Sequence, residues 1–260
     1  MTVERPRFSQ LRSRLKARDS LIGTFVKMPT SQAIEIFGAV GFDYVVIDAE
    51  HAPLDRAAID LMVLGARSAE VAPVVRVGHA GEILTALDCG AMGVMVPHVR
   101  SAAEAREVAR ACRYANGTRG FAGLTRASGW GARNGVQHMA AQDDQIACIA
   151  MIEDVEAVDL ADEIAATPGI DAIFVGRGDL TASFGDDPEA SAKVARLTER
   201  IAAACGRTGT PLMMLATSTA DAATVRGLGA TAILVSSDHG FLKSAAAAAM
   251  KDFAAPGKAG

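Results

Sequence analysis

The stretch GFDYVVI, residues 41–47, decides the fold of this chain. It recurs in altered form as GAMGVMV at 90–96 and as GATAILV at 229–235. In each copy a glycine follows a segment with helical spacing, where the end of a helix favours a left-handed residue. The apolar run after the glycine has the length and the β-branched content of a buried strand. This repeated order of helix, glycine and strand is typical of a parallel sheet with crossover helices.

Eight such apolar runs can be counted outward from these three. The predicted strands cover 23–27, 44–50, 73–77, 93–99, 147–153, 172–176, 211–216 and 230–236. Helices are expected at 32–40, 56–66, 102–112 and 219–228, each after an N-capping residue: Thr30 or Ser31, Asp55, Ser101 and Ser218. A (β/α)8 barrel needs eight strands and about 250 residues. The sequence therefore predicts an α/β fold, a single TIM barrel domain over residues 1–260.

Charge and cysteine usage narrow the class of partner. The formal net charge is -4 and there is no run of basic residues, so nothing favours nucleic acid or an anionic membrane. The cysteines at 89, 112, 148 and 205 form no CxxC pair and are expected to be buried thiols. No stretch approaches the roughly 18–20 unbroken apolar residues of a membrane span. We expect a cytoplasmic protein with a small-molecule substrate.

Polar side chains stand where the predicted strands end. In barrel enzymes the reactive groups lie at the carboxyl ends of the strands. Here those ends carry, in chain order, Asp48, Glu50, His51, Arg76, Glu153 and Asp179. Because all eight strands are parallel, these side chains are expected at one rim.

Glu153 and Asp179 follow adjacent strands, which brings two carboxylates close together. A divalent cation removes their repulsion and keeps positions open for water and substrate. Mg²⁺ and Mn²⁺ are the first candidates, followed by Co²⁺ and Zn²⁺. The alternative is that each carboxylate caps a helix N-terminus, a role open to Asp179 in particular.

His51 and Arg76 are the other candidates at this rim. His51 lies beside acidic neighbours in a loop, as a general base does, although a solvent histidine would look the same. Arg76 ends a buried strand and needs an anion, either a structural carboxylate or a substrate oxyanion. Asp88 by itself would be a surface residue late in a helix. The histidines at 79, 98, 138 and 239 share no metal-ligand spacing and are interpreted as structural.

Two segments interrupt the repeat. Residues 114–144 are rich in Gly, Arg and Asn and too long for an ordinary strand-to-helix connection, so they are a candidate active-site loop. The tail after Met250 contains Pro256 and two glycines and is expected to fray.

The strand-end residues occur in motifs that resemble one family. In order along the chain they are DAEHAP at 48–53, PVVR at 73–76, LD at 87–88 with GVMVP at 93–97, RY at 113–114 with TRG at 118–120, MIE at 151–153, and GIDAIFVG at 169–176 with GDL at 178–180. The chain resembles the HpcH/HpaI aldolases, the class II pyruvate aldolases that include 4-hydroxy-2-oxoheptanedioate and 2-dehydro-3-deoxyglucarate aldolases. The match covers residues 8 to 242, nearly the whole chain.

The resemblance implies reversible cleavage of 4-hydroxy-2-oxo acids to pyruvate, or hydroxypyruvate, and an aldehyde through a metal-stabilised enolate. It implies that Glu153 and Asp179 bind the metal and that the amides of Gly178 and Asp179 help hold the donor carboxylate. By the same resemblance Arg76 stabilises the enolate, and His51 with Asp88 forms the acid/base dyad, with Asp48 among the catalytic residues.

Two positions depart from the family pattern. Met151 stands where some members have glutamine, and Arg177 stands where many have proline or a small residue. Either side chain would contact the substrate and alter its selection, Met151 by lacking an amide and Arg177 by adding a cation. The family is usually hexameric with the last helix packed onto a neighbour, which makes residues 241–250 a subunit contact by resemblance.

Three other functions remain open from the sequence. Lys27, which ends the first strand, is the one lysine placed for a Schiff-base aldolase. A CoA-ester lyase of the citrate-lyase β-subunit type shares the barrel, but no segment is dedicated to CoA. A non-catalytic barrel is disfavoured because acid, base, arginine and two carboxylates share one rim.

Overall fold

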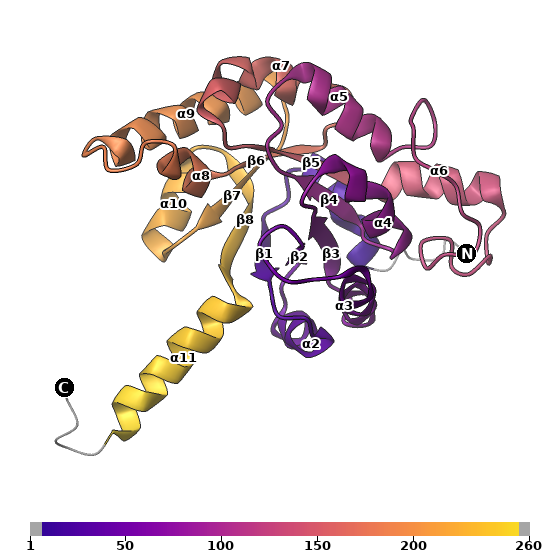
Figure 1. The fold of residues 1–260 in the computed structure, drawn as a ribbon, viewed down its shortest axis with the longest axis horizontal. Helices are drawn as coiled ribbons and strands as arrows, with labels where there is room; N and C mark the ends of the chain where they lie inside the picture. Colours follow the sequence, from indigo (N-terminus) through magenta and orange to yellow (C-terminus); the bar gives the residue numbers. More distant parts are fainter. Residues whose placement is uncertain (1–6, 255–260) are drawn as a thin grey trace.

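The computed structural model describes residues 7–254 and shows eight parallel strands closed into a barrel, with β8 paired to β1 (Figure 1). The strands are β1 Leu21–Val26, β2 Tyr44–Asp48, β3 Ala72–Arg76, β4 Gly93–Val96, β5 Ala147–Ile152, β6 Ala172–Val175, β7 Leu212–Ala216 and β8 Ala230–Ser237. The predicted (β/α)8 barrel is confirmed. All eight predicted strands are present, and their ends agree with the predicted ones to within three residues.

The helices alternate with the strands and surround the barrel (Figure 1). They are α1 Leu11–Lys16, α2 Ser31–Val40, α3 Arg56–Ser68, α4 Ile83–Asp88, α5 Ala102–Ala111, α6 Gly135–Gln145, α7 Ala161–Ala165, α8 Arg177–Ala182, α9 Ala190–Thr208, α10 Thr219–Gly227 and α11 Asp238–Phe253, with 3-10 turns η1 Arg7–Gln10, η2 Ala80–Glu82 and η3 Val155–Leu160. No helix among residues 7–254 combines the length and the hydropathy that a membrane span needs.

Capping chemistry begins and ends these helices as the sequence predicts. The side chains of Thr30, Asp55, Ser101 and Ser218 each accept a backbone N–H from the first turn of α2, α3, α5 and α10. Gly41 ends α2 in the left-handed conformation with φ of 102°, which a residue with a Cβ adopts only under strain.

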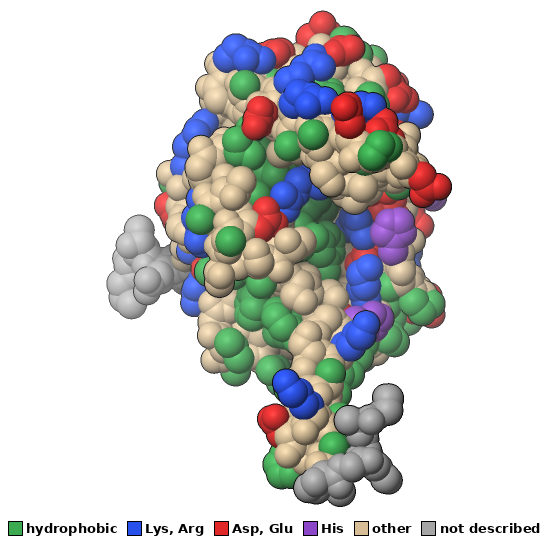
Figure 2. Space-filling view, turned by 90° about the vertical axis from the view of Figure 1, so that its left-hand side faces the viewer, with side chains coloured by type: hydrophobic (Ala, Val, Ile, Leu, Met, Phe, Trp, Pro, Cys, Tyr) green, Lys and Arg blue, Asp and Glu red, His purple; other side chains and the backbone are tan. Residues whose placement is uncertain are grey.

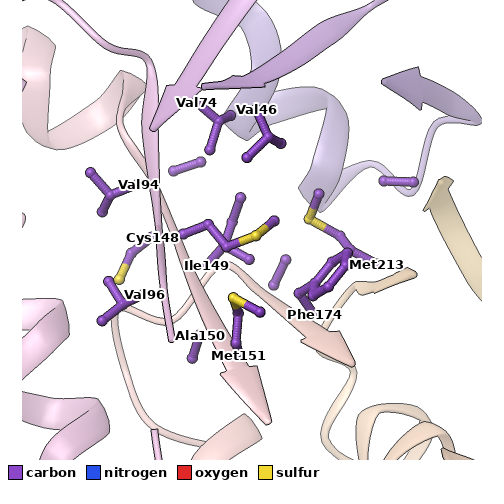
Figure 3. Packing of buried hydrophobic residues seen from close by; sticks show 14 of the residues in the cluster. Val46, Val74, Val94, Val96, Cys148, Ile149, Ala150, Met151, Phe174 and Met213 are labelled. Atoms are coloured by element: carbon purple, nitrogen blue, oxygen red, sulfur yellow. The ribbon is translucent and has the colours of Figure 1, made fainter. Parts of the chain in front are cut away.

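The core lies inside the barrel and between the strands and helices. Every residue of β2, β3, β4, β5 and β6 is buried, because helices cover the outside of the sheet and side chains fill the inside. Along β5, Ile149 and Met151 point to one side of the strand and Cys148 and Ala150 to the other (Figure 3). The four cysteines are buried and free, as expected.

The segment 114–144 was predicted to be an active-site loop, and its place in this chain differs from that prediction in two respects. Its second part forms α6, which Asn134 caps by accepting the N–H of Gln137. The buried face of α6 carries His138 and Gln142 rather than an apolar stripe, so its periodicity is hidden. The segment also joins the end of α5 to the start of β5, which places it at the amino ends of the strands, away from the rim.

The last helix is longer and more exposed than expected. α11 continues through Phe253, so the chain does not fray directly after Met250, and residues 255–260 lie outside the described part. Figure 1 shows α11 leading away from the barrel, and Asp238 is the one residue of this helix that is buried. Within residues 7–254, therefore, nothing covers most of the α11 surface.

Candidate active site

The strand ends converge on one cavity of about 940 Å³. Its walls include Lys27 after β1, His51 after β2, Arg76 at the end of β3 and Asp179 after β6. Met151, Arg177 and Gly178 also line it. Residues from the ends of five different strands therefore share one space, as the strand-end argument predicts.

Asp48 and Arg76 form a buried ion pair at this rim. Arg76 donates from Nε to Asp48 Oδ1 at 2.9 Å and from Nη2 to Asp48 Oδ2 at 2.7 Å. Lys27 Nζ lies 3.1 Å from the same Oδ2, and the backbone N–H of His51 donates to Oδ1 at 3.2 Å. Burial acts to raise the pKa of Asp48, but the bonds and charge of Arg76, with the His51 N–H and Lys27, outweigh it and lower this pKa.

Glu153 has no such cation. It is 2% exposed, and its Oε1 accepts the backbone N–H of His98 at 2.9 Å. The His98 ring lies 3.6 Å away and is half exposed. Burial raises the pKa of Glu153 to about 7; the charges of Asp179 and Glu50 add to the rise, and His98 opposes it. A buried carboxylate next to other carboxylates is thus left short of positive charge.

Gly176 provides the room for this carboxylate. A Cβ at position 176 would lie 2.4 Å from Glu153 Oε2 and 2.5 Å from Glu153 Cβ. The backbone of Gly176 is unstrained, with φ of -83°, so glycine is required here by space rather than by conformation. The close approach keeps Glu153 beside the first turn of α8, which carries Asp179.

The donors present fit a divalent cation of the magnesium type. No group of three or more His, Cys, Asp or Glu side chains within residues 7–254 has the geometry of a metal cage. Glu153 and Asp179 offer two carboxylates, and water or substrate would complete the shell of a cation held by them. Mg²⁺ is commonly held in this way, by one or two carboxylates with several waters retained.

His51 and Asp88 are not brought together within one chain. His51 lies at the rim, half exposed, with Nε2 3.6 Å from Glu50 Oε2. Asp88 is the last residue of α4, near the amino ends of the strands, and its carbonyl accepts the N–H of Ala127. Its Oδ1 is buried without a hydrogen bond, and Arg119 lies 3.8 Å away. Burial raises the pKa of Asp88 despite the charge of Arg119.

The two positions that depart from the family pattern differ in role. Met151 is 1% exposed and lines the inner wall of the cavity. Arg177 lines the cavity too, but it donates to Asp221 from both Nη1 and Nη2, at 3.0 and 2.6 Å, and to the carbonyl of Leu215. The hydrogen bonds of Arg177 lower the pKa of Asp221 to about 2. The charge of Arg177 is therefore already neutralised.

Sequence reasoning missed His98 and Asp238. His98 was interpreted as an unremarkable structural residue, yet it holds Glu153 through a backbone in the left-handed region, with φ of 52°. Its position directly after β4 and Pro97 satisfies the same strand-end criterion that selected Arg76. Asp238 is buried after β8 and accepts the N–H groups of Lys27 and Met28, which ties the end of β1 to β8.

Comparison with known proteins agrees with this geometry. The family model for HpcH/HpaI aldolase/citrate lyase matches residues 21–245. Hydroxypyruvate/pyruvate aldolase of Paraburkholderia phytofirmans is 34% identical over 238 residues, 88% of this chain and 91% of that protein. 5-Keto-4-deoxy-D-glucarate aldolase of Enterobacter sp. is 32% identical over 245 residues, 91% of this chain and 93% of that protein.

A solved structure supports the same grouping. The HpcH/HpaI aldolase/citrate lyase family protein of Burkholderia cenocepacia superposes with a TM-score of 0.88 at 31% identity, covering 95% of this chain and all of that one. The chain therefore belongs to the HpcH/HpaI aldolase/citrate lyase family.

Proposed function

We propose that this protein is a class II aldolase that reversibly cleaves 4-hydroxy-2-oxo acids to pyruvate, or hydroxypyruvate, and an aldehyde. The observation that carries the proposal is Glu153, a buried carboxylate short of positive charge, next to the charge of Asp179, which lines the same cavity as Arg76 and His51. The relatives named as pyruvate and 5-keto-4-deoxy-D-glucarate aldolases support this reaction class.

Glu153 and Asp179 would hold a divalent cation, Mg²⁺ or Mn²⁺ first and Co²⁺ or Zn²⁺ next. When bound, the cation draws charge from the keto oxygen of the donor and so eases loss of a C3 proton. The N–H groups of Gly178 and Asp179 lie in the first turn of α8, where backbone donors have no partner within the helix. They are available to the carboxylate of the donor.

Arg76 would stabilise the developing enolate oxygen. Its Nε and Nη2 are held by Asp48, while Nη1 has no hydrogen-bond partner among residues 7–254 and the side chain lines the cavity. Asp48 thereby orients the guanidinium, and a fixed donor aimed at developing charge is an effective catalytic element. Arg76 itself, followed by the His51 N–H and Lys27, lowers the pKa of Asp48 and so keeps it ionised.

His51 is the acid/base group of this proposal. In the cleavage direction His51 takes the proton of the 4-hydroxyl as the C3–C4 bond breaks. In the reverse direction, aldol addition, it returns that proton to the new hydroxyl oxygen. Its partner in the dyad is Asp88, and since the two lie at opposite ends of one barrel, we propose that the dyad forms between subunits. Met151 and Arg177 complete the substrate-binding wall.

A homohexamer in which α11 packs onto a neighbouring subunit is part of the proposal. It is supported by the exposed surface of α11, on which Leu242 is 60% and Phe253 89% exposed. A cytosolic location is supported by the four free, buried cysteines.

The Schiff-base alternative finds less support. A lysine that forms a Schiff base lies in a desolvated apolar pocket or beside another cation. Lys27 instead lies in an ion pair with Asp48, 3.1 Å away. No observation favours the CoA-ester lyase or the non-catalytic barrel.

The decisive experiment is exchange of the C3 hydrogens of pyruvate with deuterium, followed by NMR with the purified protein. We expect exchange with Mn²⁺ or Mg²⁺, its loss with EDTA and its recovery on adding metal. An absence of exchange with metal present, or borohydride trapping of pyruvate on Lys27, would contradict the proposal. A panel of donors and aldehydes then identifies the substrates.

A further inference from the structure

The cavity of the candidate site continues beyond the rim of the barrel. The face seen in Figure 2 is hollowed at its centre, and hydrophobic side chains are visible inside the hollow. One part of the cavity is lined by Lys27, Arg76 and Asp179, and the other part reaches between α9 and α10. We call this second part the α9–α10 groove, defined by Ser191, Val194, Ala195, Thr198, Glu199, Asp221, Thr224 and Leu228.

The donor accounts for a small share of this space. Pyruvate has six non-hydrogen atoms and, at one water volume of roughly 30 Å³ for each, fills less than about 200 Å³. The cavity measures about 940 Å³. The remainder suits a second substrate much longer than the donor.

The walls of the groove are two helical stripes. On α9 the lining residues recur at the i, i+3, i+4, i+7 and i+8 spacing of one helix face, from Ser191 to Glu199. On α10 and the residue after it they recur at i, i+3 and i+7, from Asp221 to Leu228. Val194, Ala195 and Leu228 supply apolar surface, and the serine and two threonines of the groove supply hydroxyl groups.

The charges and hydroxyls of the groove select against an anionic ligand. Glu199 lines it, and Arg177, which lines the adjoining part of the cavity, is bound by Asp221 through both Nη atoms. Thr198 is 3% exposed, and its hydroxyl has no hydrogen-bond partner in the described part of the chain. The hydroxyls of Ser191 and Thr224 line the same groove and are not buried in this way, so they offer hydrogen-bond partners to uncharged polar groups of a ligand.

We propose that the α9–α10 groove binds the distal chain of the aldehyde acceptor, and that this chain is extended, uncharged and hydroxyl-bearing. The inference rests on the proposed aldolase function. Its support is the continuity of one cavity from Asp179 to Glu199, with Arg177 on α8 between the two parts. The aldehyde carbon would face the donor at the rim while the rest of the molecule follows the groove outward.

The test compares three acceptors with pyruvate, Mn²⁺ and the full-length enzyme: 3-hydroxypropanal, 8-hydroxyoctanal and the anionic 8-oxooctanoate. We expect kcat/KM for 8-hydroxyoctanal to exceed that for 3-hydroxypropanal roughly tenfold. This is about the effect of burying two of the additional methylene groups of the longer acceptor. 8-Oxooctanoate should show no such gain. Equal values for the two hydroxyaldehydes, or a preference for the anionic acceptor, would overturn the inference.

Variants of α9 locate the effect. Ala195→Phe fills the groove and should bring the ratio of long to short acceptor close to one. Ala203→Phe, on an exposed position of α9 outside the cavity, is the matched control and should keep the wild-type ratio. Thr224→Val keeps the shape of the side chain and should lower the ratio about threefold, which supplies a second readout if the phenylalanine variant does not fold.

The outcomes separate this inference from the function on which it rests. Failure of wild-type enzyme to exchange the C3 hydrogens of pyruvate would remove the aldolase proposal itself. Normal exchange without a length preference would remove only the groove. A change of oligomeric mass in Ala195→Phe with an unchanged length preference would mean that another copy of the chain occupies the groove, and would also overturn the inference.

Discussion

Two buried carboxylates stand at the same rim, and the protein treats them in opposite ways. Asp48 is fully buried and is met by two hydrogen bonds from Arg76, by Lys27 and by a backbone N–H. Glu153 is as deeply buried but is met by one backbone N–H and a half-exposed histidine, with Asp179 and Glu50 close enough to raise its pKa.

The difference identifies where an external cation would bind. At Asp48 the positive charge comes from the chain, so the group is locked as an anion and serves to orient Arg76. At Glu153 the chain supplies too little positive charge, and burial then favours the neutral acid. A site that is unfavourable for the bare protein is the one prepared for a ligand.

Of the variants that test this difference between Asp48 and Glu153, removal of the Glu153 carboxylate should have the largest effect. Glu153→Ala should lower metal-dependent C3 exchange of pyruvate on the order of 10³-fold or more, because one of two protein ligands is lost. Metal affinity, measured by calorimetry, should fall in parallel. Near-normal exchange in this variant would show that the cation binds elsewhere.

Removal of the cation from the opposite cluster should harm folding as well as catalysis. Arg76→Ala leaves Asp48 buried with Lys27 as the remaining cation beside it. Breaking a buried ion pair in this way costs about 3–5 kcal/mol. Denaturant unfolding measures this loss. Arg76→Lys is the control for charge without the fork geometry: it should recover part of the stability but little of the exchange.

The raised pKa of Glu153 makes the metal-free protein sensitive to pH. The pKa rises on folding from 4.5 to about 7, so the stabilisation is complete below pH 4.5 and is lost as pH rises through about 7. The loss amounts to about 3 kcal/mol. Metal-free Glu153→Gln should therefore unfold at higher denaturant concentration than wild type at pH 8 and show no such decline between pH 5 and 8.

This comparison of variant and wild type depends on the absence of metal. Saturating Mg²⁺ should restore the stability of the wild type at pH 8 and leave Glu153→Gln nearly unchanged, since a ligand stabilises only the protein that binds it. A wild type that is equally stable at pH 5 and pH 8 without metal would contradict the charge deficit at Glu153.

The smallest effect is expected at Lys27. Asp48 keeps both bonds from Arg76 when Lys27 is replaced, so Lys27→Met should lower C3 exchange by no more than about tenfold. The assay is the same NMR exchange. Complete loss of exchange in this variant, with the fold intact, would favour the Schiff-base mechanism instead.

The order of residues along the chain predicted most strands and helices, because strand formation and helix capping depend on residues that are close in sequence. Apolar runs such as 44–50 and 230–236 mark strands wherever they occur, and capping residues such as Asp55 satisfy backbone groups three residues away. Parallel strands place their carboxyl ends together, so Asp48, Arg76 and Glu153 could be assigned to one rim in advance. α6 escaped prediction because its buried face is polar.

Tertiary structure decided how each charge is compensated. The sequence alone determined the barrel and the residues at its rim, but Lys27 meets Asp48 only because β1 pairs with β2 in the register that sets Val26 beside Ile47. Tertiary structure also separates Asp88 from His51, since a helix that follows a strand returns to the opposite end of the barrel. The α9–α10 groove depends on the same packing. These features arise from distances between residues far apart in the chain, which no local pattern encodes.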